Sequence, residues 1–60
     1  MHATKYAVVY IGEDGRERTF KTWADDGRGA VKNLFHAQGV TRDRIVQIDR
    51  VRDGRRERVG

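Results

Sequence analysis

Hydrophobic and polar residues alternate over the first third of the chain in a pattern that predicts a β-hairpin. Residues 4–11 are rich in β-branched and aromatic side chains, and residues 17–23 largely alternate polar with apolar side chains. The Asp14-Gly15 pair between these two runs is typical of a tight hairpin connection. We therefore expect a β-hairpin over residues 4–23.

The length of the hairpin loop decides which side chains share a face of the sheet. A two-residue loop pairs Val9 with Phe20, whereas a three-residue loop with a glycine bulge pairs Val8 with Phe20. In both registers Trp23 lies beside Lys21 on the face that the following helix leaves open, unless Trp23 folds back onto the first helical turn as a hydrophobic staple. We favour the three-residue loop because it gives the core two tyrosines. Its core side chains are Tyr6, Val8, Tyr10 and Phe20.

The segment that follows has the spacing of an amphipathic helix over about residues 25–38. Asp25 or Asp26 supplies the N-cap, and Gly39 stands where a left-handed residue commonly ends a helix. Gly27 and Gly29 indicate either a late, ragged helix start or a close approach of the helix to the sheet. The face expected to be buried carries Ala30, Val31, Leu34 and Phe35.

Residues 44–52 alternate again and predict a third strand. The alternation breaks between Ile48 and Val51, and a β-bulge near Asp49 and Arg50 would return both apolar side chains to one face. The second and third strands are expected to form the two edges of the sheet, where unpaired backbone groups can recruit a partner.

The order of these elements predicts an α+β fold in one domain over residues 1–60. Asp53-Gly54 is a second turn signal, so residues 55–59 form either a short fourth strand or a frayed tail. A right-handed crossover through the helix carries the third strand to the side of the first. We expect a three- to four-stranded antiparallel sheet in the order 2-1-3, with the helix on one face and the apolar first strand in the centre.

Composition limits the chemistry that the chain can support. With 60 residues it has room for one small core, and it contains no cysteine, which fits a cytoplasmic location and removes thiolate chemistry. Its two histidines, His2 and His36, are too few for a metal site, and the longest apolar run, Tyr6 to Ile11, is far shorter than a membrane span. We expect no metal, no cofactor and no membrane partner.

The sequence contains no set of residues that predicts catalysis. Serine and cysteine are absent, and the adjacent acids fall at the hairpin turn and at the helix cap, where solvated carboxylates are ordinary. Residues 12–15 lack the Gly-Lys-Ser/Thr ending of a phosphate-binding loop. We therefore expect a binding protein without a small-molecule substrate, and not an enzyme.

Basic residues are concentrated in the last third of the chain. The formal net charge is +4, and residues 42–60 hold seven arginines against four acids. Arginine binds phosphates and carboxylates through a bidentate fork, and an exposed Trp with apolar neighbours often marks an interaction site. The first hypothesis is a protein–protein interface, homodimerisation included, and the alternative is a nucleic-acid-binding module. The expected partner-binding residues are Trp23, Lys21, Arg44, Arg50 and Arg52, and those of the nucleic-acid alternative are Arg42, Arg55, Arg56 and Arg58.

The whole chain resembles the small β-β-α-β proteins of phages and mobile elements, among them some anti-CRISPR proteins. The resemblance rests on residues 5–10, the Asp14-Gly15 turn, residues 19–24 and residues 45–51. It implies a host-directed inhibitor that docks on a protein or a nucleoprotein. The two helix glycines depart from the acidic helix formers usual in such proteins, and the net positive charge argues against an inhibitor that mimics DNA.

Overall fold

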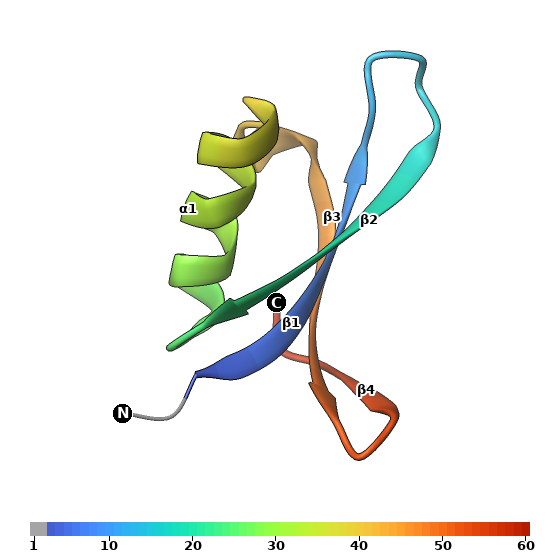
Figure 1. The fold of residues 1–60 in the computed structure, drawn as a ribbon. Helices are drawn as coiled ribbons and strands as arrows, with labels where there is room; N and C mark the ends of the chain where they lie inside the picture. The colour runs from blue at the N-terminus through green and yellow to red at the C-terminus, as the bar shows by residue number, and fades with distance from the viewer. Residues whose placement is uncertain (1–2) are drawn as a thin grey trace.

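The computed structural model describes residues 3–60 and shows a four-stranded antiparallel sheet in the order β2-β1-β3-β4, with one helix against one face (Figure 1). This arrangement confirms the expected α+β fold, in which the first strand is central. The sheet is strongly twisted, as Figure 1 shows. The elements are β1 (Thr4–Ile11), β2 (Glu17–Ala24), α1 (Gly27–Gln38), the 3-10 turn η1 (Arg42–Arg44), β3 (Ile45–Arg52) and β4 (Arg55–Arg58).

The hairpin of β1 and β2 has the register of the three-residue loop. Val8 lies opposite Phe20, the N–H of Gly15 donates to the carbonyl of Gly12 at 3.0 Å, and the N–H of Gly12 donates to the carbonyl of Arg16 at 2.8 Å. Gly15 has a φ of 80°, a left-handed conformation that a glycine adopts without a steric penalty. The loop chemistry read from the sequence therefore fixes which side chains face the helix.

Both predicted caps of α1 are present. The side chain of Asp26 accepts a hydrogen bond from the N–H of Gly29 at 2.8 Å, and Gly39 ends the helix with a φ of 70°. The helix begins at Gly27, two residues later than the expected start near residue 25. A Cβ added to Gly29 would lie 3.1 Å from the Cβ of Ala24, so this glycine allows the first helical turn to approach the end of β2 closely.

The core lies between α1 and the first two strands. The side chain of Asn33 donates to Thr22 Oγ1 at 3.0 Å and to the carbonyl of Trp23 at 3.1 Å, which fixes the helix over β2. This orientation turns Phe35 toward the side of α1 that leads away from β2. The expected burial of Phe35 is therefore wrong, because its side chain is 51% exposed. The buried hydrophobic cluster consists of Tyr6, Val8, Tyr10, Ala24, Ala30, Leu34 and Val40, with Phe20, Ile45 and Ile48 packed against it.

The irregularity in β3 lies nearer its start than expected. Val9 lies opposite Gln47, whereas Tyr10 lies opposite Ile45, so Val46 is the extra residue and is 46% exposed. The expected bulge near residues 49–50 is therefore wrong. Because the register is regular from Gln47 onward, Ile48 lies on the helix face and the half-buried Val51 lies on the opposite face.

The segment after Asp53-Gly54 is a strand and not a frayed tail. Asp53 and Gly54 have φ values of 50° and 75°, as a two-residue hairpin turn requires, and β4 pairs with β3. The last residues continue this contact, since the N–H of Val59 donates to the carbonyl of Ile48 at 2.8 Å. The expectation that the third strand is a sheet edge is therefore wrong, and the edges are β2 and β4.

The described residues were also compared with the requirements of a membrane span and of a metal site. No helix among them is long and apolar enough to cross a membrane. Within residues 3–60, no group of three or more potential metal-ligating side chains comes together. His2, which entered the prediction about metals, lies outside the described residues.

Candidate binding surface on the open sheet face

The face of the sheet opposite α1, here called the open face, presents side chains in rows that cross the strands. In the first row, Lys5 lies opposite Trp23 on one side and Val51 on the other, and Val51 lies opposite Arg56. Directly opposed residues of an antiparallel pair share a face, so these four side chains emerge on the same side. The next row contains Lys21, Ala7, Asp49 and Arg58.

Trp23 is the most exposed large apolar side chain of the open face. It is 63% exposed and stands near the end of β2, at the edge of the sheet. Its carbonyl is held by Asn33 of the helix, whereas the register directs its side chain to the opposite face. The predicted placement of Trp23 away from the helix is confirmed, and the alternative of a staple on the first helical turn is wrong.

Four basic residues belong to these two rows of the open face, and they are called the basic cluster from here on. Lys21, Arg56 and Arg58 are exposed, and Lys5 is half-buried. The ion pairs found in residues 3–60 join Arg18 to Asp14 and Arg50 to Glu57, so they involve no member of this cluster. The charges of the basic cluster are therefore not neutralised by ion pairs within the part of the chain that the structure describes. The basic cluster consists of Lys5, Lys21, Arg56 and Arg58.

One carboxylate lies within the basic cluster. Asp49 is only 2% exposed and accepts a hydrogen bond from Nε2 of Gln47 at 2.8 Å. It stands between Ala7 and Arg58 in the second row. Asp49 thus lowers the positive charge of the open face from beneath its surface.

Folding places three of the four acids of the last third away from the open face. Glu57 lies on the helix side of the sheet, where its Oε2 is 3.0 Å from Arg50. Asp43 accepts a hydrogen bond from the Thr41 hydroxyl at the far end of β3, and this bond lowers the pKa of its carboxyl. Asp53 lies in the β3–β4 turn. Besides the buried Asp49, the open face carries Glu17, beyond the basic cluster.

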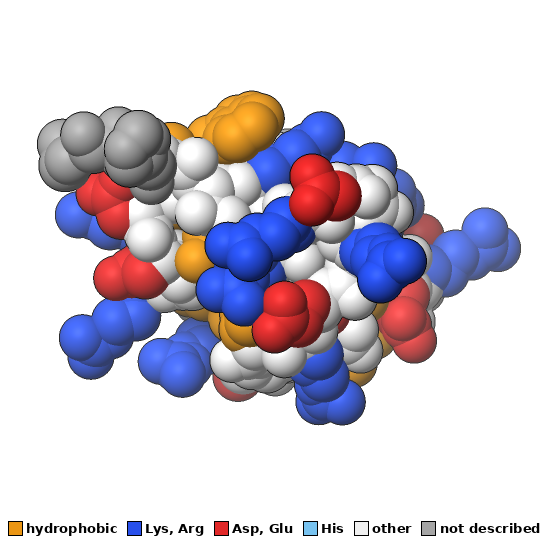
Figure 2. All heavy atoms as spheres, turned by 90° about the horizontal axis from the view of Figure 1, so that it is seen from below, with side chains coloured by type: hydrophobic (Ala, Val, Ile, Leu, Met, Phe, Trp, Pro, Cys, Tyr) orange, Lys and Arg blue, Asp and Glu red, His pale blue; other side chains and the backbone are white. Residues whose placement is uncertain are grey.

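The predicted site residues are divided between two faces and two ends of the molecule. Arg50 points to the helix side, where its Nε is buried without a hydrogen-bond partner among the described residues. Figure 2, which views the molecule from below, shows Lys and Arg side chains all around the end that carries the β3–β4 turn, with acidic side chains between them. The open face unites Trp23, Lys21, Arg56 and Arg58, whereas Arg50, Arg52 and Arg55 lie on the helix side and Arg42 and Arg44 lie in η1.

Lys5 is the member of the basic cluster that sequence reasoning missed. It lies directly opposite Trp23 and neighbours Val51 on the other side. The sequence did indicate its position, because Lys5 stands two residues before Ala7, and residues two apart lie on the same face of a regular strand. The three-residue loop was enough to assign Lys5 to the open face. In the register that pairs Val8 with Phe20, Lys5 pairs with Trp23 and therefore shares its face.

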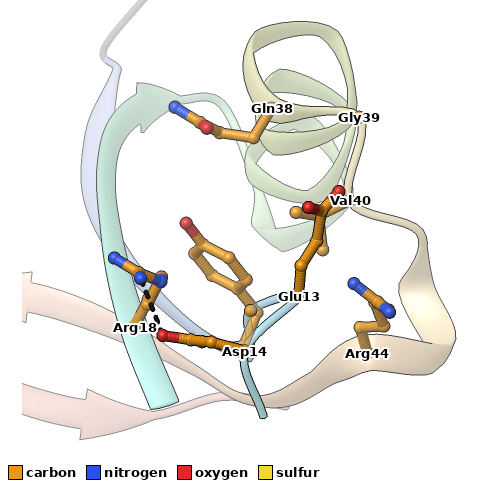
Figure 3. A pocket seen from close by; sticks show the side chains of 9 residues that line it. Glu13, Asp14, Arg18, Gln38, Gly39, Val40 and Arg44 are labelled. Carbon is orange, nitrogen blue, oxygen red and sulfur yellow. Dashed lines mark hydrogen bonds and ion pairs between the residues drawn. The ribbon is translucent and has the colours of Figure 1, made fainter. Parts of the chain in front are cut away.

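A separate polar hollow lies at the other end of the sheet, between the hairpin loop, the end of α1 and the start of β3 (Figure 3). Arg18 and Arg44 stand on opposite sides of it, and Arg18 is bound to Asp14 at 3.0 Å. The backbone N–H of Arg16 and then the charge of Arg18 lower the pKa of the Asp14 carboxyl. The acids and bases of this hollow are mixed, and one pair is already satisfied internally, so the open face is the stronger candidate.

Comparison of the sequence with known protein families and with curated proteins, and of the structure with solved structures, finds no match.

Proposed function

We propose that this chain is a non-enzymatic binding domain that docks its open sheet face on an acidic macromolecule. The observation that carries this proposal is the position of Trp23, 63% exposed, in a row that also contains Lys5 and Arg56. Trp and Arg are the side chains that most often dominate binding energy at interfaces. A domain of this size gains little from leaving a Trp in water unless a partner covers it.

The polar groups of the open face suit anion binding. They include two ammonium groups and two guanidinium groups, together with the buried carboxylate of Asp49 and the amide of Gln47. Ammonium and guanidinium groups donate hydrogen bonds to phosphates and carboxylates. This set contains no nucleophile beside a general base, so the proposed role includes no catalytic step and no cofactor.

Charge also favours a foreign partner over a second copy of this chain on the open face. Two copies docked face to face would bring their basic clusters together, and like charges in close contact oppose association. An acidic protein surface or a nucleoprotein, as the resemblance to phage inhibitors implies, carries the complementary charge. The cysteine-free sequence is compatible with such a partner in a reducing cytoplasm.

Two neighbouring arginines provide a matched test of this proposal. Arg56 belongs to the basic cluster, whereas Arg55 points to the helix side of the same strand. The substitutions Arg56→Glu and Arg55→Glu change the net charge equally. On immobilised heparin, a sulfated polyanion, we expect Arg56→Glu to elute at clearly lower salt than the unmodified protein, and Arg55→Glu to elute close to it.

Retention that falls equally in the two variants would contradict the proposal, because it would follow net charge and not the open face. Circular dichroism of both variants checks that the fold is retained. Both side chains are exposed, so neither substitution disturbs the buried core. Gel filtration of the unmodified protein at several concentrations tests whether a second copy of the chain is the partner. A stable dimer that survives Trp23→Ala would show that self-association uses a surface other than the open face.

A further inference from the structure

We propose that the partner of the open face is a single-stranded nucleic acid, with one base stacked on Trp23 and backbone phosphates on the basic cluster. This inference rests on the proposed function and names its partner. Among acidic macromolecules, a single strand offers both a negative charge at every unit and flat aromatic faces that are free to stack.

The open face combines an exposed ring with an adjacent cation. Trp23 and Lys5 are directly opposed on neighbouring strands, which stand about 4.8 Å apart. A base that covers the ring of Trp23 therefore brings its own phosphate within reach of the flexible Lys5 side chain. Stacking tolerates every base, so this contact predicts affinity with little sequence preference.

Further cations of the basic cluster lie across the sheet from Trp23. The first row crosses all four strands and ends at Arg56, about 14 Å from the start of the row at the usual strand spacing. The second row, which begins at Lys21 and ends at Arg58, runs beside it at about 6.8 Å along the strands. A nucleic-acid strand that crosses the sheet from β2 toward β4 would keep its phosphates between these two rows, each of which contributes two cations, and above the buried Asp49 of the second row.

Trp23 offers a single strand a contact that a duplex cannot use. Among residues 3–60, the open face carries one aromatic side chain and no helix, and α1 lies on the other side of the sheet. In a duplex the base faces are stacked on one another and cannot reach Trp23, so a duplex would use the cations alone. An acidic protein surface would likewise use the cations, but it would not provide a base for the ring.

The experiment uses the single Trp of the chain as its own probe. Oligothymidylate and oligouridylate of about twelve nucleotides, a length within the range that one small domain covers, are titrated while the Trp fluorescence is recorded. We expect quenching with at least one of them. The logarithm of affinity should fall with the logarithm of salt with a slope of about −2.8 when four phosphates are contacted, at about 0.7 for each.

Variants separate the two kinds of contact. Trp23→Ala should weaken binding of the single strand by about 5- to 100-fold and leave the salt slope unchanged, while Trp23→Phe restores part of the loss. Arg56→Ala should reduce the slope by about 0.7, and the control Arg55→Ala should leave it unchanged. Affinities of the variants are measured by anisotropy of labelled oligonucleotides, because the Trp23 variants lack the fluorescent probe.

Several results would overturn this inference. Failure of both single strands to bind at about 50 mM salt would do so, as would a duplex of equal length that binds as tightly as the single strands. If heparin is retained through Arg56 but no single strand quenches Trp23, the nucleic-acid partner is wrong and the proposed acidic-partner function stands. If heparin retention is also insensitive to Arg56→Glu, the proposed function itself fails.

Discussion

Asp49 is a residue whose removal should strengthen binding. It lies beneath the open face, 2% exposed, among side chains of the basic cluster. In Asp49→Asn the shape is kept, and the amide oxygen can still accept the hydrogen bond from Gln47. The substitution removes one negative charge next to the bound anion, so we expect polyanion affinity to rise by about two- to fivefold at low salt.

The comparison for this prediction is Asp43→Asn, which makes the same change of charge in η1, at the other end of the sheet. Heparin elution and oligonucleotide anisotropy of the two variants should differ, with Asp49→Asn the tighter binder. Circular dichroism of both variants checks that the fold is retained, so that a gain of affinity reports the lost charge. Equal affinities of the two variants would show that Asp49 lies away from the bound anion.

At this residue scale, the sequence predicted the faces of β2 but not those of β4. Trp23 and Lys21 have the same parity, and the loop register did not alter their face, so their placement followed from the strand pattern alone. The faces of Arg55 and Arg56 depend on how many residues the Asp53-Gly54 turn contains and on where β3 contains its bulge. Both depend on packing between strands, and the sequence gives only a weak signal for either.

At the scale of elements, the position of α1 over β1 and β2 depends on two glycines with different surroundings. A Cβ at Gly27 would lie 3.9 Å from Ile48 Cγ2, an ordinary contact, whereas a Cβ at Gly29 would lie 3.1 Å from Ala24. Neither glycine has a positive φ, so alanine fits the backbone at both positions. The difference between the two substitutions therefore reports the closeness of the helix to the sheet.

We expect Gly27→Ala to raise the free energy of unfolding by up to about 1 kcal/mol, since it removes the entropic cost of glycine in a helix. Gly29→Ala gains the same entropy but must push the helix away from the buried Ala24, so it should be less stable than Gly27→Ala by about 1 kcal/mol. Urea denaturation followed by circular dichroism measures both. A Gly29→Ala protein at least as stable as Gly27→Ala would show that the contact is loose.

Local signals predicted the elements themselves. The Asp14-Gly15 turn, the Asp26 cap and the Gly39 stop are properties of short segments, and all three appear as expected. The exposure of Phe35 and the bulge at Val46 could not be predicted in the same way. They depend on where the helix rests on the sheet, which is decided by tertiary contacts such as those of Asn33.

At the scale of the whole molecule, β4 changes both the sheet and the charge distribution. It covers the outer edge of β3, and the N–H of Ile48 donates to the carbonyl of Gly60 at 2.9 Å. The fourth strand also places Arg56 and Arg58 on the open face and turns Glu57 to the helix side. The same chain segment therefore moves the sheet edge from β3 to a short, charged strand, which disfavours unwanted pairing, and completes the basic cluster.

The opposite side of the molecule offers a competing surface. Since α1 lies over β1 and β2, a shallow groove remains between the helix and the C-terminal residues, lined by Val31, Ile48 and Val59. Val59 is 47% exposed. Nothing in this groove selects an occupant of particular charge, because Asp26 stands beside Arg28 and Arg42 on its rim. The open face and this groove are far enough apart to be distinguished residue by residue.

The most direct test of the account is an NMR titration of the ¹⁵N-labelled protein with a short heparin oligosaccharide, which maps the bound surface. We predict that the largest shifts affect the indole N–H of Trp23 and the backbone amides of Lys21 and Arg56, and that they decrease as salt is added. Shifts concentrated on Val31 and Val59, with the Trp23 indole unmoved, would contradict the assignment of the open face as the working surface.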